Sequence, residues 1–292
     1  RAMRGWARRG LLLFWVLTFC ALVSFLIVWL SPAVTLSDVY ELGTGTFQPP
    51  LIVSLVLLWC LVGTALWWLS RHEPTPEALV LFAGAVTISL LYLSFLREHV
   101  WFGDFQLYVR AAKTIQAGAG MTPRYVYPPF WAFLLATINS ALGSGTVADR
   151  AIILFCFAIN HLSIVGFFVL GSLFLARCGL SRAFSCVLIF AAMIINVPVL
   201  RNMVYVQVNL VMLDLVLGGI LVFRRSVVLS ALLFAIATHI KVVPVLLVPV
   251  FLYRREYLWV TLYALFLGGI AWVTTLSGGL MYFCTMTEIP IV

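Results

Sequence analysis

The chain has 292 residues, of which 64% are hydrophobic and 10% are charged, and its mean hydropathy is +1.12. These values exclude an ordinary soluble domain and predict an all-α polytopic membrane protein with a single transmembrane domain over residues 1–292. The net charge of +8 does not indicate nucleic-acid binding, because the cations fall mostly between apolar segments, where they orient membrane helices. The six cysteines include no Cys-x-x-Cys pair, so no metal or redox site is expected.

The chain begins with Arg1, Arg4, Arg8 and Arg9, and an apolar span over about residues 11–30 follows. A basic start before an apolar span is typical of a cytoplasmic N-terminus followed by a signal anchor. We therefore expect the N-terminus inside the cell.

Two further spans are expected at about residues 51–69 and 78–96, joined by a turn that contains Arg71. The connection at residues 31–50 carries carboxylates but no Lys or Arg, so we expect it outside the cell. The third span then leads outward again and places Asp104 on the outer face of the plasma membrane.

The longest segment of mixed polarity covers residues 101–131, and we interpret residues 97–128 as an external catalytic loop. Asp104 lies at its start, where it is either a catalytic base or an ordinary solvated carboxylate. Apolar residues then recur at helical spacing beside Arg110 and Lys113, which predicts a short amphipathic helix with its aromatic face in lipid and its cations toward phosphates. Glycines and prolines after this helix predict a jointed loop.

The remaining apolar segments allow two topologies. If every segment crosses the membrane in turn, the cations divide almost evenly between the two sides, and no bias remains. In the arrangement that we favour, residues 129–142 are re-entrant or interfacial, and residues 227–253 form a hairpin broken at Lys241 and Pro244. The cytoplasmic cations are then Arg1, Arg4, Arg8, Arg9, Arg71, Arg177, Arg182, Arg224, Arg225, Arg254 and Arg255.

This arrangement predicts about seven to nine transmembrane or re-entrant segments. The other full spans are expected at about residues 151–175, 183–199, 204–223 and 258–276. The polar residues that this topology brings to the outer half of the membrane are Asp104, Arg201, Gln207, Asn209 and Lys241. Polar groups that are scattered in sequence are thus expected to converge.

Three side chains in this part of the chain are candidates for binding an anion. Lys241 precedes a proline that breaks its helix, so its ammonium either meets an anionic ligand or extends to the interface. Arg201 lies in a turn between apolar spans, and Arg and Lys from separate loops can clamp a phosphate. His239 is a weaker candidate, because a lone histidine in an apolar helix is more often hydrogen-bonded in the core.

Asp214 and His161 are ionisable groups within apolar spans, which makes them functional candidates as well. Gln207 and Asp214 lie two helical turns apart and are expected on one face of a continuous helix. For Asp214 we favour a polar contact that locks two helices together.

Together these features resemble glycosyltransferase family 87, whose members are GT-C-type enzymes that use polyprenyl-phosphate sugars. The matching motifs, in the family's order, are DFxxYxxAA from Asp104 to Ala112, YPP from Tyr127 to Pro129, QVNL from Gln207 to Leu210, and KxxP from Lys241 to Pro244. Each motif is short, but their common order makes the resemblance fairly specific.

The resemblance implies a GT-C-like helical bundle with an external loop helix, and an enzyme that needs no cofactor beyond its lipid-linked donor. Asp104 would deprotonate a hydroxyl of a lipid or cell-envelope glycan acceptor, which attacks the anomeric carbon of a mannose- or arabinofuranose-like sugar. The residues that would bind the leaving polyprenyl phosphate are Lys241, Arg201 and His239. The residues that would bind substrate are Tyr108, Tyr125, Tyr127, Gln207 and Asn209. Aromatic residues are equally typical of the membrane interface, so the tyrosines allow both interpretations.

The chain departs from the family pattern in two ways. About three spans precede Asp104, whereas the family's catalytic Asp usually follows the first span, and the family's C-terminal spans are not expected here. The rival hypothesis is a lipid-linked sugar flippase or transporter, which would need a polar route through the midplane. The only residues that could line such a route are Asp214, His161 and His239.

Overall fold

The computed structural model describes residues 2–30, 49–72, 75–98, 105–117, 128–142 and 146–274. Within these ranges the protein contains 12 α-helices, one short 3-10 helix and no strand. The helices are α1 (Ala2–Leu30), α3 (Pro49–Arg71), α4 (Pro76–Glu98), α5 (Phe105–Gln116), α6 (Pro129–Ala141), α7 (Thr146–Arg177), α8 (Arg182–Ile195), α9 (Val197–Tyr205), α10 (Asn209–Val222), α11 (Val227–Ile240), η1 (Val243–Leu247), α12 (Val248–Tyr253) and α13 (Tyr257–Thr274). The expected all-α class is confirmed.

In the part of the chain that the structure describes, five helices, α1, α3, α4, α7 and α13, are long and apolar enough to cross a membrane. The protein is therefore an all-α polytopic membrane protein. The span that we expected at residues 183–199 is instead a pair of helices, α8 and α9, that meet at an angle of 76°. The helix breaks there because Asn196 accepts a hydrogen bond from the backbone of Val199 at 3.2 Å and so caps a new helix, which begins next to Pro198.

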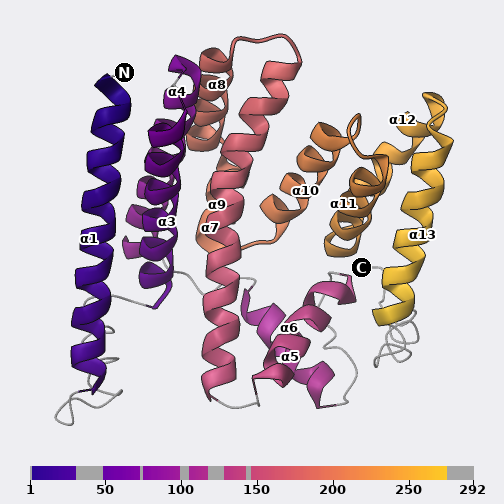
Figure 1. The fold of residues 1–292 in the computed structure, drawn as a ribbon. Helices are drawn as coiled ribbons and strands as arrows, with labels where there is room; N and C mark the ends of the chain where they lie inside the picture. The colour runs from indigo at the N-terminus through magenta and orange to yellow at the C-terminus, as the bar shows by residue number, and fades with distance from the viewer. Residues whose placement is uncertain are drawn as a thin grey trace.

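The arginine-bearing turns lie at the same end of the bundle as the N-terminus (Figure 1). They are the turns between α7 and α8, between α10 and α11, and between α12 and α13. At the other end, α5 and α6 lie side by side below the hairpin of α10 and α11 (Figure 1). The chain reverses after α11, so α11 and α12 run in opposite directions, as in the topology that we favoured.

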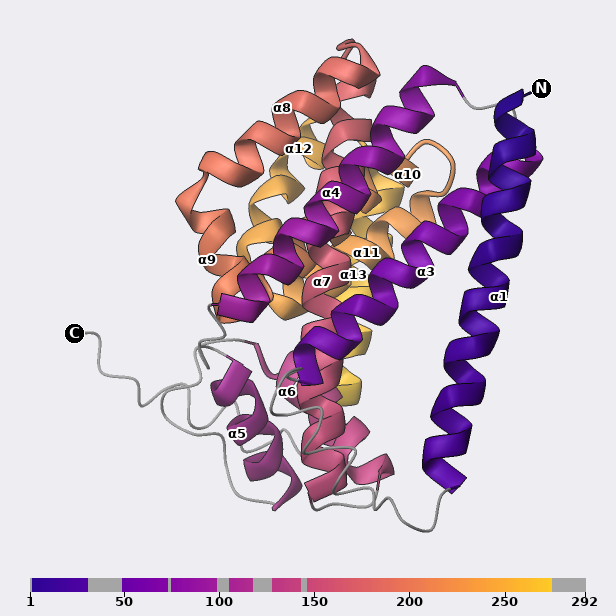
Figure 2. The same cartoon turned by 90° about the vertical axis from the view of Figure 1, so that its left-hand side faces the viewer.

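Helix α7 is the centre of the bundle, and α3, α4, α6, α8 and α10 pack around it (Figure 2). Its buried side chains include Phe157, Ile164 and Phe168, each of which is 0% exposed. By contrast, α1 packs mainly on α3, and large residues such as Leu12 and Phe19 are exposed on it. Exposed apolar side chains of this kind suit contact with lipid, because lipid is as apolar as the core.

A second cluster joins α11 to α13. Trp259 is fully buried, stacks on Phe251 at a centroid distance of 3.7 Å, and donates a hydrogen bond from Nε1 to Ser230 Oγ at 3.0 Å. Phe234 packs edge-on against the same ring. These contacts hold the α10–α11 hairpin firmly against α13, which positions the polar residues at the end of α11.

Candidate active site

Three polar side chains meet where α9, α10 and α11 end or begin. Lys241 Nζ donates a hydrogen bond to Asn209 Oδ1 at 2.8 Å, and Asn209 Nδ2 donates to Gln207 Oε1 at 2.9 Å. All three side chains are partly exposed. We call Lys241, Asn209 and Gln207 the polar chain. The structure thus brings together three of the site residues that the sequence analysis named.

The backbone between α9 and α10 places Gln207 and Asn209. Val206 ends α9 in the left-handed region at φ 53° and ψ 48°, and its N–H and that of Gln207 both bond to the Asn202 carbonyl. This conformation is rare for a β-branched residue and costs about 1–3 kcal/mol, and such strain is concentrated at functional sites. Asn209 then becomes the first residue of α10, with its side chain directed toward Lys241.

The chain beyond α11 places Lys241. Lys241 is extended, at φ −154° and ψ 134°, and its N–H makes the last helical bond, to the Ala237 carbonyl at 2.9 Å. Pro244 has no N–H to continue the helix, and a short 3-10 helix, η1, follows. The helix break predicted at Lys241 and Pro244 is confirmed. It places the ammonium of Lys241 beside irregular backbone. Within a membrane, irregular backbone occurs only where it is buried in the protein or lines a cavity.

His239 lies two residues before Lys241, in the last turn of α11, and faces α13 and α6. Its Nε2 is 2.9 Å from the Leu267 carbonyl, and its ring lies 6.0 Å from the Phe130 ring. Since a carbonyl only accepts, Nε2 carries the hydrogen, and Nδ1 of the neutral ring is then an acceptor. Phe130 directly follows the Tyr-Pro-Pro motif, so this contact brings the start of α6 to the end of α11.

Tyr108 occupies a different environment from the one that the sequence predicted. Its ring is 1% exposed and meets Trp131 edge-on at 6.4 Å, while Ala111 and Ala112 are fully buried. The apolar face of α5 therefore packs on α6 and α7, not in lipid, because both environments are apolar and the protein offers the closer fit. Tyr108 offers no open ring face to a sugar in this structure.

Arg201 is not joined to the polar chain. Its guanidinium lies over the Tyr205 ring, 5.7 Å from the centroid, on the exposed side of α9. Asp104, Tyr125 and Tyr127 lie outside the described residues, so their predicted roles remain predictions. Among the described residues, no three His, Cys, Asp or Glu side chains gather closely enough to hold a metal ion.

Asp214 contacts α7 from the middle of α10. Ser163 hydrogen-bonds its carboxyl, and a Cβ added to Gly166 would lie 2.7 Å from Asp214 Oδ2. Asp214 thus joins two helices, as we favoured. The expectation that Gln207 and Asp214 share one continuous helix is wrong, because Val206 ends α9 and α10 starts only at Asn209.

A buried polar group that contacts α9 was missed in the sequence analysis. Asn160 on α7 donates to Tyr92 Oη at 2.7 Å and to the Met203 carbonyl at 3.4 Å, and it is 2% exposed. Next to it, His161 Nε2 lies 2.6 Å from Ser89 Oγ. Asn160 therefore ties α9 to the centre of the bundle just before the strained turn. The Asn-His pair within an apolar span was the available signal, because polar side chains there seek partners on other helices.

A family model described as Glycosyltransferase family 87 matches residues 125–288, more than half of the chain. The matched residues include the Tyr-Pro-Pro motif, the Gln207 and Asn209 segment, and the Lys241 segment, whereas Asp104 precedes them. Among curated proteins and solved structures, none matches the chain.

The apolar helices and the family match together define a membrane glycosyltransferase. The chain belongs to glycosyltransferase family 87.

Proposed function

We propose that this enzyme transfers a mannose- or arabinofuranose-like sugar from a polyprenyl-phosphate carrier to a lipid or cell-envelope glycan at the outer face of the plasma membrane. One observation carries the proposal. The polar chain joins the Gln207–Asn209 segment to Lys241, and the His239–Phe130 contact brings the start of α6 to the last turn of α11, so three separated, family-matched segments meet at this end of α11.

The partner of Lys241 suits a site for a phosphate. Asn209 accepts a hydrogen bond through a neutral amide, so it orients the ammonium without neutralising it. A carboxylate at the same place would cancel the charge before a donor arrived. The positive charge thus stays available for an anionic ligand, and its attraction is strong because the surroundings are apolar.

The proposed reaction exchanges one glycosidic bond for another. Asp104 takes the proton from an acceptor hydroxyl, and the oxygen attacks the anomeric carbon. The bond from that carbon to the phosphate oxygen breaks, and the bonding pair leaves with the polyprenyl phosphate. Lys241 stabilises the charge that develops on the leaving oxygen, with Arg201 as a further cation if it turns away from Tyr205.

The hydrogen bond of His239 to Leu267 determines which ring nitrogen carries the hydrogen. Because Nε2 donates to the Leu267 carbonyl, Nδ1 of the neutral ring accepts, which suits a sugar hydroxyl. It meets a phosphate favourably only as the imidazolium. We therefore extend its proposed role from the donor phosphate to the sugar that the phosphate carries.

The position of the site in the bundle supports the outer face. The arginine-bearing turns and the N-terminus share one end, and the start of α10 and the end of α11, which carry the polar chain, face away from it toward α5 and α6 (Figure 1). Membrane proteins keep such cations on the cytoplasmic side. A lipid carrier then supplies an activated sugar where nucleotide sugars are absent.

Substitution of Lys241 tests the function. Lys241→Met keeps the apolar stem and removes the charge, so we expect kcat/KM for a polyprenyl-phosphate sugar to fall by about 30- to 1,000-fold, or about 2–4 kcal/mol. Lys241→Arg should keep part of the activity, since the charge survives. The matched control is Lys113→Met on the exposed face of α5, which should stay within about twofold.

Full activity of Lys241→Met would remove the phosphate-binding role and leave a lysine that merely extends to the interface. Flipping of a lipid-linked sugar by the purified wild type, with no transfer to any acceptor, would overturn the proposed function as a whole.

A further inference from the structure

At the end of the bundle where α7 ends and α8 begins, three arginines line one cavity of about 400 Å³. Arg177 ends α7, Arg182 begins α8, and Arg225 lies in the turn after α10. The other walls are apolar and include Leu170 and Leu173. We call this cavity the arginine pocket. It lies between the end of α7, the start of α8 and the end of α10.

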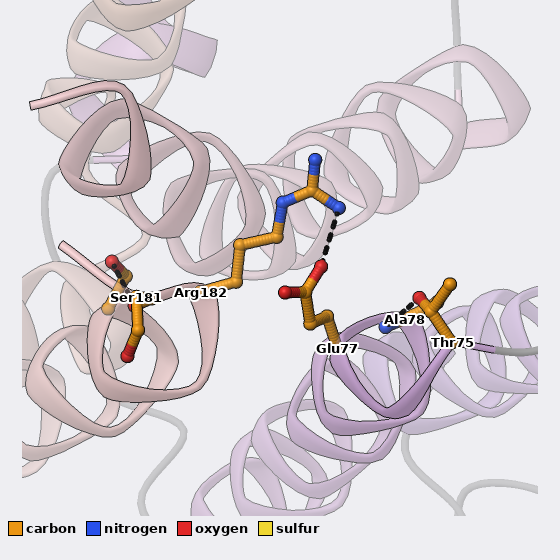
Figure 3. Close-up of polar contacts among 6 residues, drawn as sticks. Thr75, Glu77, Ala78, Ser181 and Arg182 are labelled. Carbon is orange, nitrogen blue, oxygen red and sulfur yellow. Dashed lines mark hydrogen bonds and ion pairs between the residues drawn. The ribbon is translucent and has the colours of Figure 1, made fainter. Parts of the chain in front are cut away.

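The protein balances only part of the charge in this pocket. Arg182 Nη1 lies 3.2 Å from Glu77 Oε2 at the start of α4, and the two side chains are 59% and 51% exposed (Figure 3). An ion pair this exposed contributes little, so a phosphate can share or replace it. Arg177 Nη1 donates to the Leu221 carbonyl, which fixes the guanidinium but keeps its charge. Among the described residues, no other carboxylate pairs with the three arginines.

The contact between Arg182 and Glu77 joins two capped helix starts. Thr75 Oγ1 accepts a backbone N–H of the first turn of α4 at 3.2 Å, and Ser181 Oγ accepts one of α8 at 3.3 Å. Figure 3 shows the Glu77–Arg182 contact reaching from one capped turn to the other. The backbone that carries Glu77 and Arg182 is therefore fixed before any ligand binds.

An apolar cavity of about 270 Å³ adjoins the arginine pocket and shares Leu173 and Arg182 with it. Large side chains such as Trp68 and Phe82 line it. Ser172 also lines it, and its hydroxyl is buried with no hydrogen-bond partner among the described residues. A buried hydroxyl without a partner costs about 1–3 kcal/mol, so an acceptor from a ligand would stabilise it.

We propose that these two cavities bind one anionic membrane phospholipid, with its phosphate in the arginine pocket and an acyl chain in the apolar cavity. One guanidinium group can donate two parallel hydrogen bonds to the oxygens of a phosphate. Basic pockets between membrane helices bind anionic lipid headgroups. A free phosphate would gain nothing from the leucine and aromatic walls. A phospholipid also carries ester oxygens just below its phosphate, which can accept from Ser172. This inference does not depend on the proposed reaction.

Lipid binding to the purified full chain in detergent tests the inference, with native mass spectrometry as the readout. The probes are dioleoyl phosphatidylglycerol, which is anionic, and dioleoyl phosphatidylcholine, which is neutral overall. We expect wild type to prefer the anionic lipid about tenfold, and Arg225→Gln to lose about fivefold of its affinity for it. Arg225 suits the test because it is exposed and has no side-chain ion pair within the described residues.

The matched control is Arg254→Gln, which removes an exposed arginine from another turn at the same end of the bundle. It should change the affinity for phosphatidylglycerol by less than about twofold. An equal loss in both variants would overturn the pocket in favour of diffuse surface charge. Thermal unfolding of each variant checks that both remain folded.

Two competitors separate the possible sources of phosphate. Glycerol 3-phosphate has the anionic group without acyl chains, and displacement of the lipid at equal concentration would overturn the role of the apolar cavity. Polyprenyl phosphate that displaced phosphatidylglycerol at a lower concentration would assign the pocket to the donor lipid instead. Failure of both competitors, together with the loss in Arg225→Gln, supports the phospholipid site.

Discussion

The two ends of the α10–α11 hairpin are built differently. At the turn between the helices, Ser226 Oγ accepts the Leu229 N–H at 3.1 Å, and Arg225 N–H bonds to the Val222 carbonyl at 2.8 Å. At the open end, the backbone of Val206 is strained and that of Lys241 is extended. The side chains of Lys241 and Asn209 are hydrogen-bonded to each other there.

This difference separates stability from function within one hairpin. A capped turn satisfies its backbone groups locally, so a ligand there can meet only side chains such as that of Arg225. A broken helix end places polar groups in apolar surroundings. Their burial costs free energy unless a ligand or a water-filled cavity supplies the missing hydrogen-bond partners. Substitutions at the open end should therefore reduce activity, and those at the turn or between the helices should reduce stability.

The largest effect is expected from Asp104→Asn, which removes the proposed base. The amide cannot take the proton from the hydroxyl of the acceptor substrate, so we expect kcat for sugar transfer to fall by about 10²- to 10⁴-fold. The rate is measured with a polyprenyl-phosphate sugar in detergent or proteoliposomes. The melting temperature should stay unchanged, because asparagine has nearly the same shape. Near-normal transfer by Asp104→Asn would leave Asp104 as an ordinary solvated carboxylate.

Asn209→Leu should give the next largest effect. It removes the acceptor of Lys241 and the donor to Gln207, and we expect kcat/KM to fall by about 10- to 100-fold, or about 1.5–3 kcal/mol. Because Asn209 acts by orienting Lys241, its loss should matter less once the charge is gone.

A double-mutant cycle measures that dependence. In the Lys241→Met background, the effect of Asn209→Leu on kcat/KM should shrink to less than about threefold. Strict additivity of the two substitutions would show that Asn209 contacts substrate by itself, without acting through the lysine.

The two ends also differ in how well the sequence predicted them. The helix break at Lys241 was predictable because a proline three residues later cannot continue a helix. The break at Val206 was not, since nothing in its side chain favours the left-handed conformation, and tertiary packing imposes it. The apolar face of α5 was predicted correctly, but periodicity does not distinguish lipid from protein as its partner. The bonds of Asn160 to Tyr92 and Met203 join three helices, and no spacing rule connects such distant residues.

Between the two ends, a pair of neighbouring glycines tests packing alone. A Cβ at Gly219 would lie 2.7 Å from the fully buried ring of Phe234, whereas one at Gly218 would meet Leu233 at an ordinary 3.8 Å. We expect Gly219→Ala to lower the free energy of unfolding by about 1–3 kcal/mol relative to Gly218→Ala, because both gain the same helix propensity and only one overpacks.

Thermal or denaturant unfolding in detergent compares these two variants, and kcat/KM of the folded fraction should be similar in both. Equal stability would mean that Phe234 moves aside easily, in spite of its packing against Phe251 and Trp259.

The smallest effect is expected at the capped turn. Ser226→Ala removes the oxygen that accepts the Leu229 N–H, and an N-cap of this kind contributes about 1 kcal/mol. Ser226→Asp restores an acceptor at the start of α11, where a negative charge is also favourable, so it should recover that stability. Neither substitution touches the polar chain, so kcat/KM should stay within about twofold in both, in contrast to Asn209→Leu at the open end. If Ser226→Ala instead lowered kcat/KM as strongly as Asn209→Leu does, the cap at the start of α11 would also determine the position of Lys241 at its end. The two ends of the hairpin would then be energetically coupled.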